Sequence, residues 1–212
     1  MHQANIIEIW KSKADADKRA FVIPDGCQDV IIVQPNQASP VINISPLYTQ
    51  TIAVDIEKGT EMLGFRLKPG CSFKGLDLAA LKQKRFDETW LEDYIENNTQ
   101  VNDNVWELLQ CIRKESGDIT SIAAVLGVSI RTLQRTLKQH TSQSPLFWLR
   151  LARVRKCAKA IITSGNHSDI AYDFQYSDQA HMCREVKHWL GVTPTQLATR
   201  QDIRAQLFDE GY

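Results

Sequence analysis

At 212 residues, the chain exceeds the ~150 residues expected of one domain. Its content of 43% hydrophobic and 24% charged residues is that of a globular protein and excludes a disordered chain. The formal net charge is zero, but residues 1–103 carry 11 Lys and Arg against 15 Asp and Glu, whereas residues 104–200 carry 13 against 7. A basic region beside an acidic one is typical of a DNA-binding domain attached to a domain with another role. We therefore predict two domains, over residues 1–100 and 101–212.

The cysteines are scattered without CxxC or paired spacing: Cys27, Cys71, Cys111, Cys157 and Cys183. The sequence thus predicts neither a disulfide framework nor a zinc site, indicates no cofactor, and favours a reducing compartment. Its apolar runs fall short of the ~18 residues that a membrane-spanning helix needs, and residues 1–11 do not resemble a signal peptide. We expect a cytoplasmic protein with no membrane partner.

The first 75 residues are predicted to form short strands. Segments rich in Ile, Val, Phe and Trp alternate with turn signals such as Pro69-Gly70, and these segments are 5–10, 19–23, 29–34, 51–55 and 62–67. Strands without long helices between them predict a small antiparallel sheet, cupin-like or a partial barrel. With the helices expected in the second half, the fold class is α+β.

Pro24-Asp25-Gly26 is typical of a tight turn between strands. A second interpretation is that Asp25, Asp29 and Arg66 lie near one another and bind a small polar effector. An enclosing barrel commonly needs about eight strands, and only about five are predicted. We therefore expect a shallow polar cleft, or a surface for a second chain, rather than a deep pocket.

Residues 76–97 have the apolar spacing of one or two helices. Trp90, Leu91, Tyr94 and Ile95 share one side, which we expect to pack against the sheet or a partner subunit. The polar stretch 97–104 lacks periodicity and is predicted to be the linker between the domains.

Residues 119–194 contain one pattern twice. In each copy an Ile-Ala pair leads into an amphipathic run centred on an arginine, Arg135 in the first copy and Arg184 in the second, with apolar residues two positions before and after it. A short helix, a turn and a second helix make a helix-turn-helix unit, whose second helix enters the DNA major groove. The sequence therefore predicts two such units in tandem.

The helices predicted for the second domain are 104–116, 121–126, 130–139, 145–163, 169–174, 178–189 and 195–201. Thr120, Ser129 and Ser168 are candidate N-caps, and Gly127 stands at a turn where a left-handed conformation is often needed. The helix over 145–163 is long enough to hold the two units about 30 Å apart, close to the ~34 Å of one DNA turn. Its outer side is expected to be positive, from Arg150, Arg153, Arg155, Lys156 and Lys159.

The outer faces of the two recognition helices carry the chemistry of DNA contact, because Arg bonds bidentately to guanine, Gln bonds to adenine and Lys bonds to phosphate. The candidates are Arg131, Thr132, Gln134, Arg135 and Lys138 in the first helix, and Gln179, Ala180, His181, Arg184 and Lys187 in the second. A solvated face is the alternative for one isolated helix, but two in tandem within a basic region favour DNA. A metal role for His181 is disfavoured because no partner stands at ligand spacing.

Residues 170–187, followed by Gly191-Val192-Thr193-Pro194, resemble the signature of the AraC/XylS family of bacterial transcription regulators, and residues 129–137 resemble the family's first unit. The resemblance covers residues 104–200. It implies a sequence-specific DNA-binding regulator whose partner is double-stranded DNA, with RNA polymerase and a small-molecule effector as further candidates, acting as a monomer or homodimer. By position it implies base or backbone contact by Arg131, Gln134, Arg135, Gln179, Ala180, His181 and Arg184. The Pro-Asp-Gly-Cys and Pro-Gly segments also resemble a short sensor domain of some members.

Some positions depart from the family's pattern, among them Gln175 and Ser142. Gln175 occupies the turn where the family usually has Gly, and Ser142 replaces the usual Gly before Pro145. If the chain needs a positive φ at Gln175, a cost of up to about 1 kcal/mol is expected.

Two other functions remain as alternatives. A DNA-repair methyl-transfer protein with helix-turn-helix units of this kind needs an activated cysteine, but neither Cys27 nor Cys71 has a neighbouring His or a zinc-type cysteine set. An adaptor that binds only protein is the second alternative, and a salt-dependent shift of a DNA duplex distinguishes it. We therefore expect no enzymatic activity.

Overall fold

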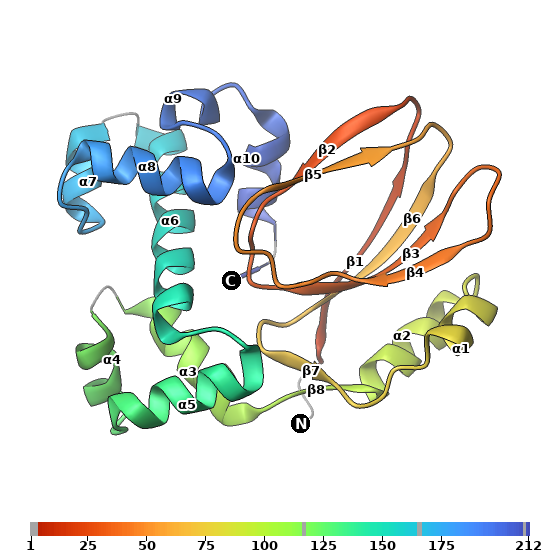
Figure 1. The fold of residues 1–212 in the computed structure, drawn as a ribbon, viewed down its shortest axis with the longest axis horizontal. Helices are drawn as coiled ribbons and strands as arrows, with labels where there is room; N and C mark the ends of the chain where they lie inside the picture. The colour runs from red at the N-terminus through yellow and green to blue at the C-terminus, as the bar shows by residue number, and fades with distance from the viewer. Residues whose placement is uncertain (1–3, 116–117, 165–166, 210) are drawn as a thin grey trace.

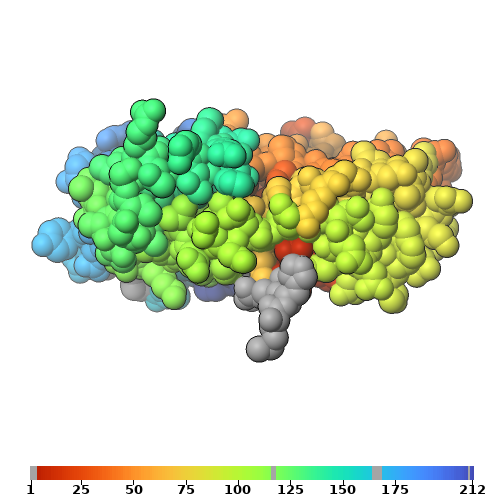
Figure 2. Space-filling view, turned by 90° about the horizontal axis from the view of Figure 1, so that it is seen from below, coloured from red at the N-terminus to blue at the C-terminus, as the bar shows by residue number. Residues whose placement is uncertain are grey.

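The computed structural model describes residues 4–115, 118–164, 167–209 and 211–212, in which an antiparallel sheet domain lies beside a helical domain (Figure 1). The space-filling view shows the two side by side along the long axis, with the helical units at one end (Figure 2). The predicted α+β class is therefore confirmed. Within the described residues, every helix is too short or too polar to cross a membrane.

The strands of the N-terminal domain form a four-stranded sheet, a two-stranded ribbon and a small second pair. The bounds are β1 Ile6–Lys13, β2 Lys18–Val22, β3 Gln28–Gln34, β4 Val41–Ile44, β5 Ile52–Ile56, β6 Glu61–Leu67, β7 Cys71–Phe73 and β8 Thr99–Val101. The sheet has the order β1-β6-β3-β4, β2 pairs with β5, and β7 pairs with β8, all antiparallel. Figure 1 shows the β2–β5 ribbon on one side of the sheet and two helices on the other.

All five predicted strands are present, as β1, β2, β3, β5 and β6, whereas the sequence did not indicate β4, β7 or β8. β8 lies inside the stretch predicted as a linker, which is therefore not unstructured. Thr99 is only 2% exposed and donates from Oγ1 to the carbonyl of Ile95 at 2.8 Å. A three-residue strand is too short for a two-residue period to show, so only its pairing with β7 reveals it.

The face of the sheet opposite the ribbon is covered by α1 Leu78–Gln83 and α2 Glu88–Asn97, so the predicted helical stretch is two helices. Val30 and Phe65 from the sheet pack with Leu91 and Ile95 in one buried core. The rings of Trp90 and Tyr94 stack at 4.6 Å on the same side. The apolar side of α2 therefore packs against the sheet of its own domain, which is one of the two arrangements predicted from the sequence.

The helical domain contains α3 Asp103–Lys114, α4 Ile119–Val125, α5 Ile130–Thr141, α6 Pro145–Ser164, α7 His167–Asp173, α8 Gln179–Leu190, α9 Pro194–Leu197 and α10 Gln201–Phe208. The long helix α6 runs between a unit formed by α4 and α5 and a unit formed by α7 and α8 (Figure 1). Its fully buried residues include Trp148, Leu151, Val154 and Ala158. The two predicted helix-turn-helix pairs are thus both present.

Three details of the predicted helices are wrong. Asp118, not Thr120, is the N-cap of α4, because its carboxylate accepts the backbone N–H of Ser121 at 2.8 Å. The single helix predicted over 195–201 is replaced by α9 and by α10, whose Ile203 and Leu207 are fully buried. Arg155 does not face outward but is 3% exposed. The predicted helix end at 116 and the side chain of Ser168 lie outside the described residues.

Candidate nucleic-acid interface

The first recognition helix, α5, buries one side and exposes the predicted one. Ser129 caps it by accepting the N–H of Thr132 at 3.0 Å. Leu133 and Leu137, four residues apart, are fully buried, because that spacing places both on one face of a helix. The other face leaves these side chains exposed: Arg131, Gln134, Arg135 and Lys138.

The second recognition helix, α8, repeats this arrangement. Asp178 caps it by accepting the N–H of His181 at 2.6 Å, and Met182 and Val186 are fully buried. The exposed side chains are Gln179, Ala180, Arg184 and Lys187. The two helices therefore present Arg135 and Arg184 at equivalent places, each two residues after one buried apolar residue and two before the next.

Thr132, His181 and Lys138, among the predicted DNA-contacting residues, have local structural partners. The Thr132 hydroxyl lies 2.9 Å from that of Ser129. His181 Nδ1 lies 3.1 Å from Ser177 Oγ, with its ring edge-on to Tyr176. Lys138 Nζ donates to the carbonyl of Ser142 at 2.9 Å. These contacts hold the side chains at the ends of the recognition helices, so each would have to be shared or exchanged on DNA binding.

Each helix-turn-helix unit contains two residues in the left-handed backbone conformation, of which one is glycine and the other is not. Gly127 and Gln175 stand at the turns with φ of +64° and +56°, and Ser142 and Gly191 end α5 and α8 with φ of +58° and +69°. The turn hydrogen bonds are equivalent, from Val128 N to Ala123 O and from Tyr176 N to Ala171 O. Gln175 therefore adopts the positive φ at which the sequence analysis expects a cost.

Gln175→Gly is expected to raise the free energy of unfolding by about 0.5 to 1 kcal/mol, because it relieves the left-handed strain without removing a buried contact. The matched control is Gly127→Gln, which should lower it by a similar amount, since a Cβ at Gly127 would meet no atom within 4 Å and only the backbone cost remains. Urea unfolding of both variants checks this. Equal stability of Gln175→Gly and wild type would show that the turn is not strained.

The N-terminal domain contacts the helical domain at one end of the ribbon, where β2 ends and β5 begins. Thr51 donates from its N–H and from Oγ1 to the carbonyl of Trp189, at 3.1 and 2.9 Å. Gln206 on α10 donates to the carbonyl of Phe21 at 2.8 Å and accepts the N–H of Ile23 at 3.1 Å. The side chain of Gln206 thus bonds the end of β2 as a neighbouring strand would.

The predicted proximity of Asp25, Asp29 and Arg66 is confirmed. Arg66 Nε lies 3.3 Å from a carboxylate oxygen of Asp29 and 3.6 Å from one of Asp25, and its Nη1 lies 2.9 Å from Glu8. Asp29 and Arg66 are register partners on adjacent strands, which explains their contact. Whether the three residues bind an effector stays a prediction.

The same cluster borders the joint between the domains, a role that the sequence did not indicate. Arg155 of α6 donates to the carbonyls of Pro24, Gln206 and Leu207 at 3.1 to 3.3 Å. The N–H of Tyr212 donates to the carbonyl of Asp25 at 2.7 Å. A buried arginine held by backbone carbonyls could not be told from an exposed one by sequence, because carbonyl acceptors carry no residue identity.

Burial raises the pKa of Asp29 to about 6 and also raises the pKa of Asp25, while the positive charge of Arg66 opposes both shifts. A carboxyl group whose pKa is higher in the folded than in the unfolded chain stabilises the fold fully below its unfolded pKa of about 3.9. This stabilisation is lost as the pH rises through the folded pKa.

The free energy of unfolding is therefore expected to fall between about pH 4 and pH 6, and Asp29→Asn should make that fall shallower. Urea unfolding at a series of pH values measures both slopes. Asp55→Asn is the control, because Asp55 is exposed and its hydrogen bond with Arg19 lowers its pKa. Titration of Asp55 therefore changes the free energy of unfolding only below about pH 4, and this variant should leave the slope between about pH 4 and pH 6 unchanged. Identical slopes in wild type and Asp29→Asn would contradict the assignment.

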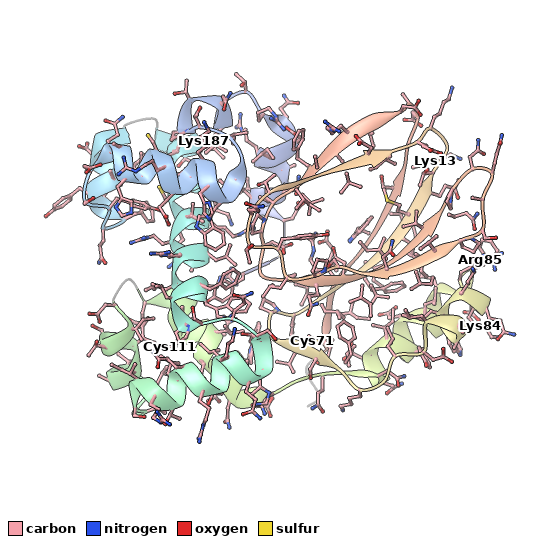
Figure 3. All side chains as sticks on the ribbon, viewed as in Figure 1. Lys13, Cys71, Lys84, Arg85, Cys111 and Lys187 are labelled. Carbon is pink, nitrogen blue, oxygen red and sulfur yellow. The ribbon has the colours of Figure 1, made fainter. Side chains whose placement is uncertain are left out.

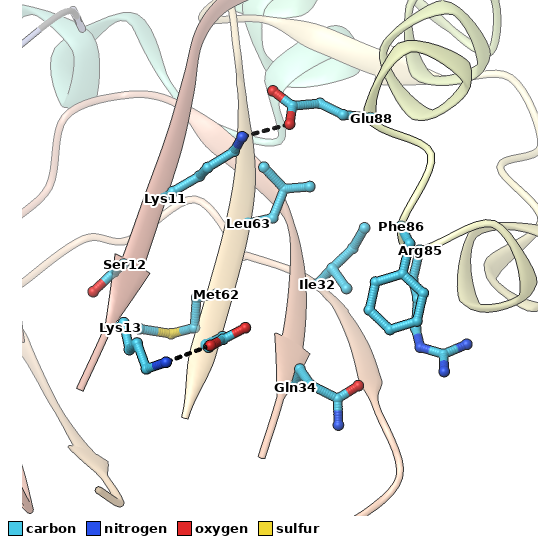
Figure 4. Close-up of a pocket in the computed structure, with 11 residues that line it drawn as sticks. Lys11, Ser12, Lys13, Ile32, Gln34, Met62, Leu63, Arg85, Phe86 and Glu88 are labelled. Atoms are coloured by element: carbon cyan, nitrogen blue, oxygen red, sulfur yellow. Dashed lines mark ion pairs between the residues drawn. The ribbon is translucent and has the colours of Figure 1, made fainter. Parts of the chain in front are cut away.

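A separate cleft of about 420 Å³ lies between the sheet and the turn joining α1 to α2 (Figure 4). Ile32 and Leu63 are among its apolar lining residues, and Lys11 and Lys13 pair with Glu88 and Glu61 at 2.5 and 2.8 Å. Its lining contains none of the three predicted effector residues. The alternation of Lys11 and Lys13 along β1 is the signal that could have found it, since it places both on one face of the strand.

Comparisons with known proteins concern mainly the helical domain. A sequence model of the helix-turn-helix domain family matches residues 122–200. The HTH-type transcriptional activator RhaS of Enterobacter sp. (strain 638) is 27% identical over 117 residues, which are 55% of this chain and 42% of that protein. The chain thus spans about two fifths of the length of this curated relative.

Two solved structures show the extent of structural similarity. The C-terminal domain of AraT, a response regulator from Geobacillus stearothermophilus, is 28% identical and covers 50% of this chain and 88% of its own, with a TM-score of 0.41. ToxT from Vibrio cholerae O395 is 9% identical and covers 93% of this chain and 98% of its own, with a TM-score of 0.46. The matched domain family shows that residues 122–200 are a helix-turn-helix domain, and the similarity to RhaS agrees with the predicted resemblance to the AraC/XylS family of transcription regulators.

Proposed function

We propose that the chain reads two successive major-groove segments of one duplex, with α5 in the first and α8 in the second. The observation that carries this proposal is the equivalence of the two units, in which Arg135 and Arg184 are exposed beside buried apolar neighbours. The 20 residues of α6 give a helix about 30 Å long, which is near the ~34 Å of one turn of DNA.

The position of the N-terminal domain is compatible with this use. It contacts the C-terminal ends of both recognition helices, at Trp189 in α8 and, through β7, at the end of α5. The reading residues nearest the N-terminal ends, Arg131 and Gln179, remain exposed. Recognition helices of this kind contact base edges mainly through their N-terminal residues, so DNA could approach without displacing the sheet domain.

We propose that the N-terminal domain modulates this binding, through a small polar effector or through a second copy of the chain. Asp25, Asp29 and Arg66 remain the proposed effector site, supported by their place next to the joint that Arg155 makes with Pro24. An activating role, as in the name of RhaS, and contact with RNA polymerase belong to the same proposal.

A methyl-transfer activity is not favoured by the cysteines. Burial raises the pKa of Cys27 well above its ordinary value and raises the pKa of Cys71 to about 11. A nucleophilic cysteine needs a lowered pKa, because the thiolate is the reacting form. We therefore propose a binding function without catalysis.

Selection of bound duplexes from a random pool by the full chain, followed by footprinting, tests the proposal. Two protected major-groove segments about one turn apart are expected, with affinity falling as salt rises. Protection of one segment only would show that a unit does not engage. Failure of the wild-type chain to retain any duplex would refute the function itself.

A further inference from the structure

An open hollow lies where the N-terminal domain meets the end of α8. Its volume is about 590 Å³. The lining on the side of α8 consists of Arg184, Lys187, His188 and Gly191, and the lining on the side of the loop before β5 consists of Gln50 and Thr51. Figure 3 labels Lys187 on this helix. Its lining contains three basic side chains and no carboxylate, so the hollow is suited to an anion.

The loop is fixed at this place by short contacts. Thr51 donates two hydrogen bonds to the carbonyl of Trp189, at 3.1 and 2.9 Å. A Cβ at Gly191 would lie 3.3 Å from the Cβ of Thr51, so glycine leaves room for this approach. The last carbonyls of a helix carry partial negative charge, and the bonds from Thr51 satisfy one of them. An anion beside Lys187 therefore meets less repulsion than at an uncapped helix end.

The equivalent end of α5 is arranged differently. Lys138, the repeat equivalent of Lys187, donates to the carbonyl of Ser142 at 2.9 Å and so closes its own helix. Among the described residues, neither Arg184 nor Lys187 has its side-chain nitrogens within 4 Å of a carboxylate. At the end of α8, Gly191 is the C-cap and Thr51 donates to the carbonyl of Trp189, so Lys187 does not cap the helix. The ammonium of Lys187 is thus available to a ligand in the second unit.

Resting on the proposed function, we propose that this hollow holds a backbone phosphate of the DNA bound by α8, and that the exposed Gln50 of the N-terminal domain donates a hydrogen bond to it. Arginine, lysine and the side-chain amides of asparagine and glutamine are among the donors that commonly hold phosphate oxygens in protein–DNA complexes. Because Gln50 stands next to Thr51, a rotation of the N-terminal domain that breaks the contact with Trp189 would also withdraw this donor. The sheet domain is then part of the DNA interface of the second unit.

The test compares Gln50 with Gln37, which is also exposed but lies in the turn between β3 and β4, at the far end of the sheet from α8 (Figure 1). Full-length Gln50→Ala, Gln50→Lys and the matched Gln37 variants are titrated against the selected duplex at several salt concentrations. We expect Gln50→Ala to weaken binding about 2- to 5-fold and Gln50→Lys to steepen the dependence of log K on log salt by about 0.9, the increment of one added phosphate contact. The Gln37 variants should match wild type.

Ethylation interference locates the contact. Ethylation of one phosphate flanking the segment read by α8 should interfere more strongly with binding of wild type and Gln37→Ala than with binding of Gln50→Ala, in which only the basic side chains still hold that phosphate. An unchanged interference pattern and salt dependence in the Gln50 variants would overturn the inference while leaving the proposed function intact. Tighter binding by Gln50→Ala would also overturn it, because the loop would then obstruct the DNA. Absence of duplex binding by the wild-type chain would instead overturn the proposed function, and this inference with it.

Discussion

Arg184→Ala is expected to weaken specific DNA binding by about 1 to 3 kcal/mol, and Arg135→Ala by a similar amount. Each arginine is exposed on a recognition helix, and a bidentate bond from a guanidinium to guanine is worth about this much against the wrong base. The free energy of unfolding should not change, because neither side chain packs in the core. Titration of the selected duplex and urea unfolding measure the two quantities separately.

Arg150→Ala is the matched control for both variants, since Arg150 is exposed on α6 rather than on a recognition helix. It removes the same charge from the same domain, so a general electrostatic effect would appear in all three variants. Loss of affinity confined to Arg135→Ala and Arg184→Ala would identify reading residues. Unaltered affinity in both would remove the case for α5 and α8 as the reading helices.

The helix-turn-helix units could be predicted from the sequence because their signals are local. A buried pair such as Leu133 and Leu137 recurs at helical spacing, and Ser129 stands where a cap is needed. These features depend on residues within about one or two turns of each other. The repeat then doubled the signal, because Met182 and Val186 follow the same spacing.

Two of the strands that the sequence did not indicate, and the last helix, are formed by distant partners. β7 and β8 exist because Ser72 and Gln100 are paired, although 28 residues separate them. α10 buries Ile203 and Leu207 and bonds the end of β2 through Gln206, and the single helix predicted there ended before these residues. Such pairings have no periodic trace in one sequence.

In the candidate site, too, some contacts could be predicted from the sequence and others could not. Asp29 and Arg66 were expected to meet, and they do because they face each other across β3 and β6. Arg155 was expected outside and is buried, because its partners are carbonyl oxygens of two distant segments, at Pro24 and in α10. The contact of Thr51 with Trp189 is also made to a carbonyl, so the place of the N-terminal domain on α8 was not predictable.

Gly64→Ala is expected to lower the free energy of unfolding by about 2 to 3 kcal/mol, as overpacking of a filled site does. Gly64 is in the interior strand β6 and pairs with Trp10 in β1 and with Ile31 in β3. A Cβ built on Gly64 would overlap the indole of Trp10, which lies directly over the backbone. The indole must then leave its place, and its buried contacts are lost. Urea unfolding followed by circular dichroism measures the change without depending on Trp10 fluorescence.

The double variant Trp10→Ala with Gly64→Ala separates this cause from a general intolerance of β6 to substitution. Trp10→Ala alone should also destabilise the fold, because it leaves a cavity over Gly64. In the double variant the methyl group occupies part of that cavity, so the loss should be smaller than the sum of the two single losses. A strictly additive result would mean that Trp10 and Gly64 do not interact. Glycine at position 64 would then need an explanation other than the space that the indole takes.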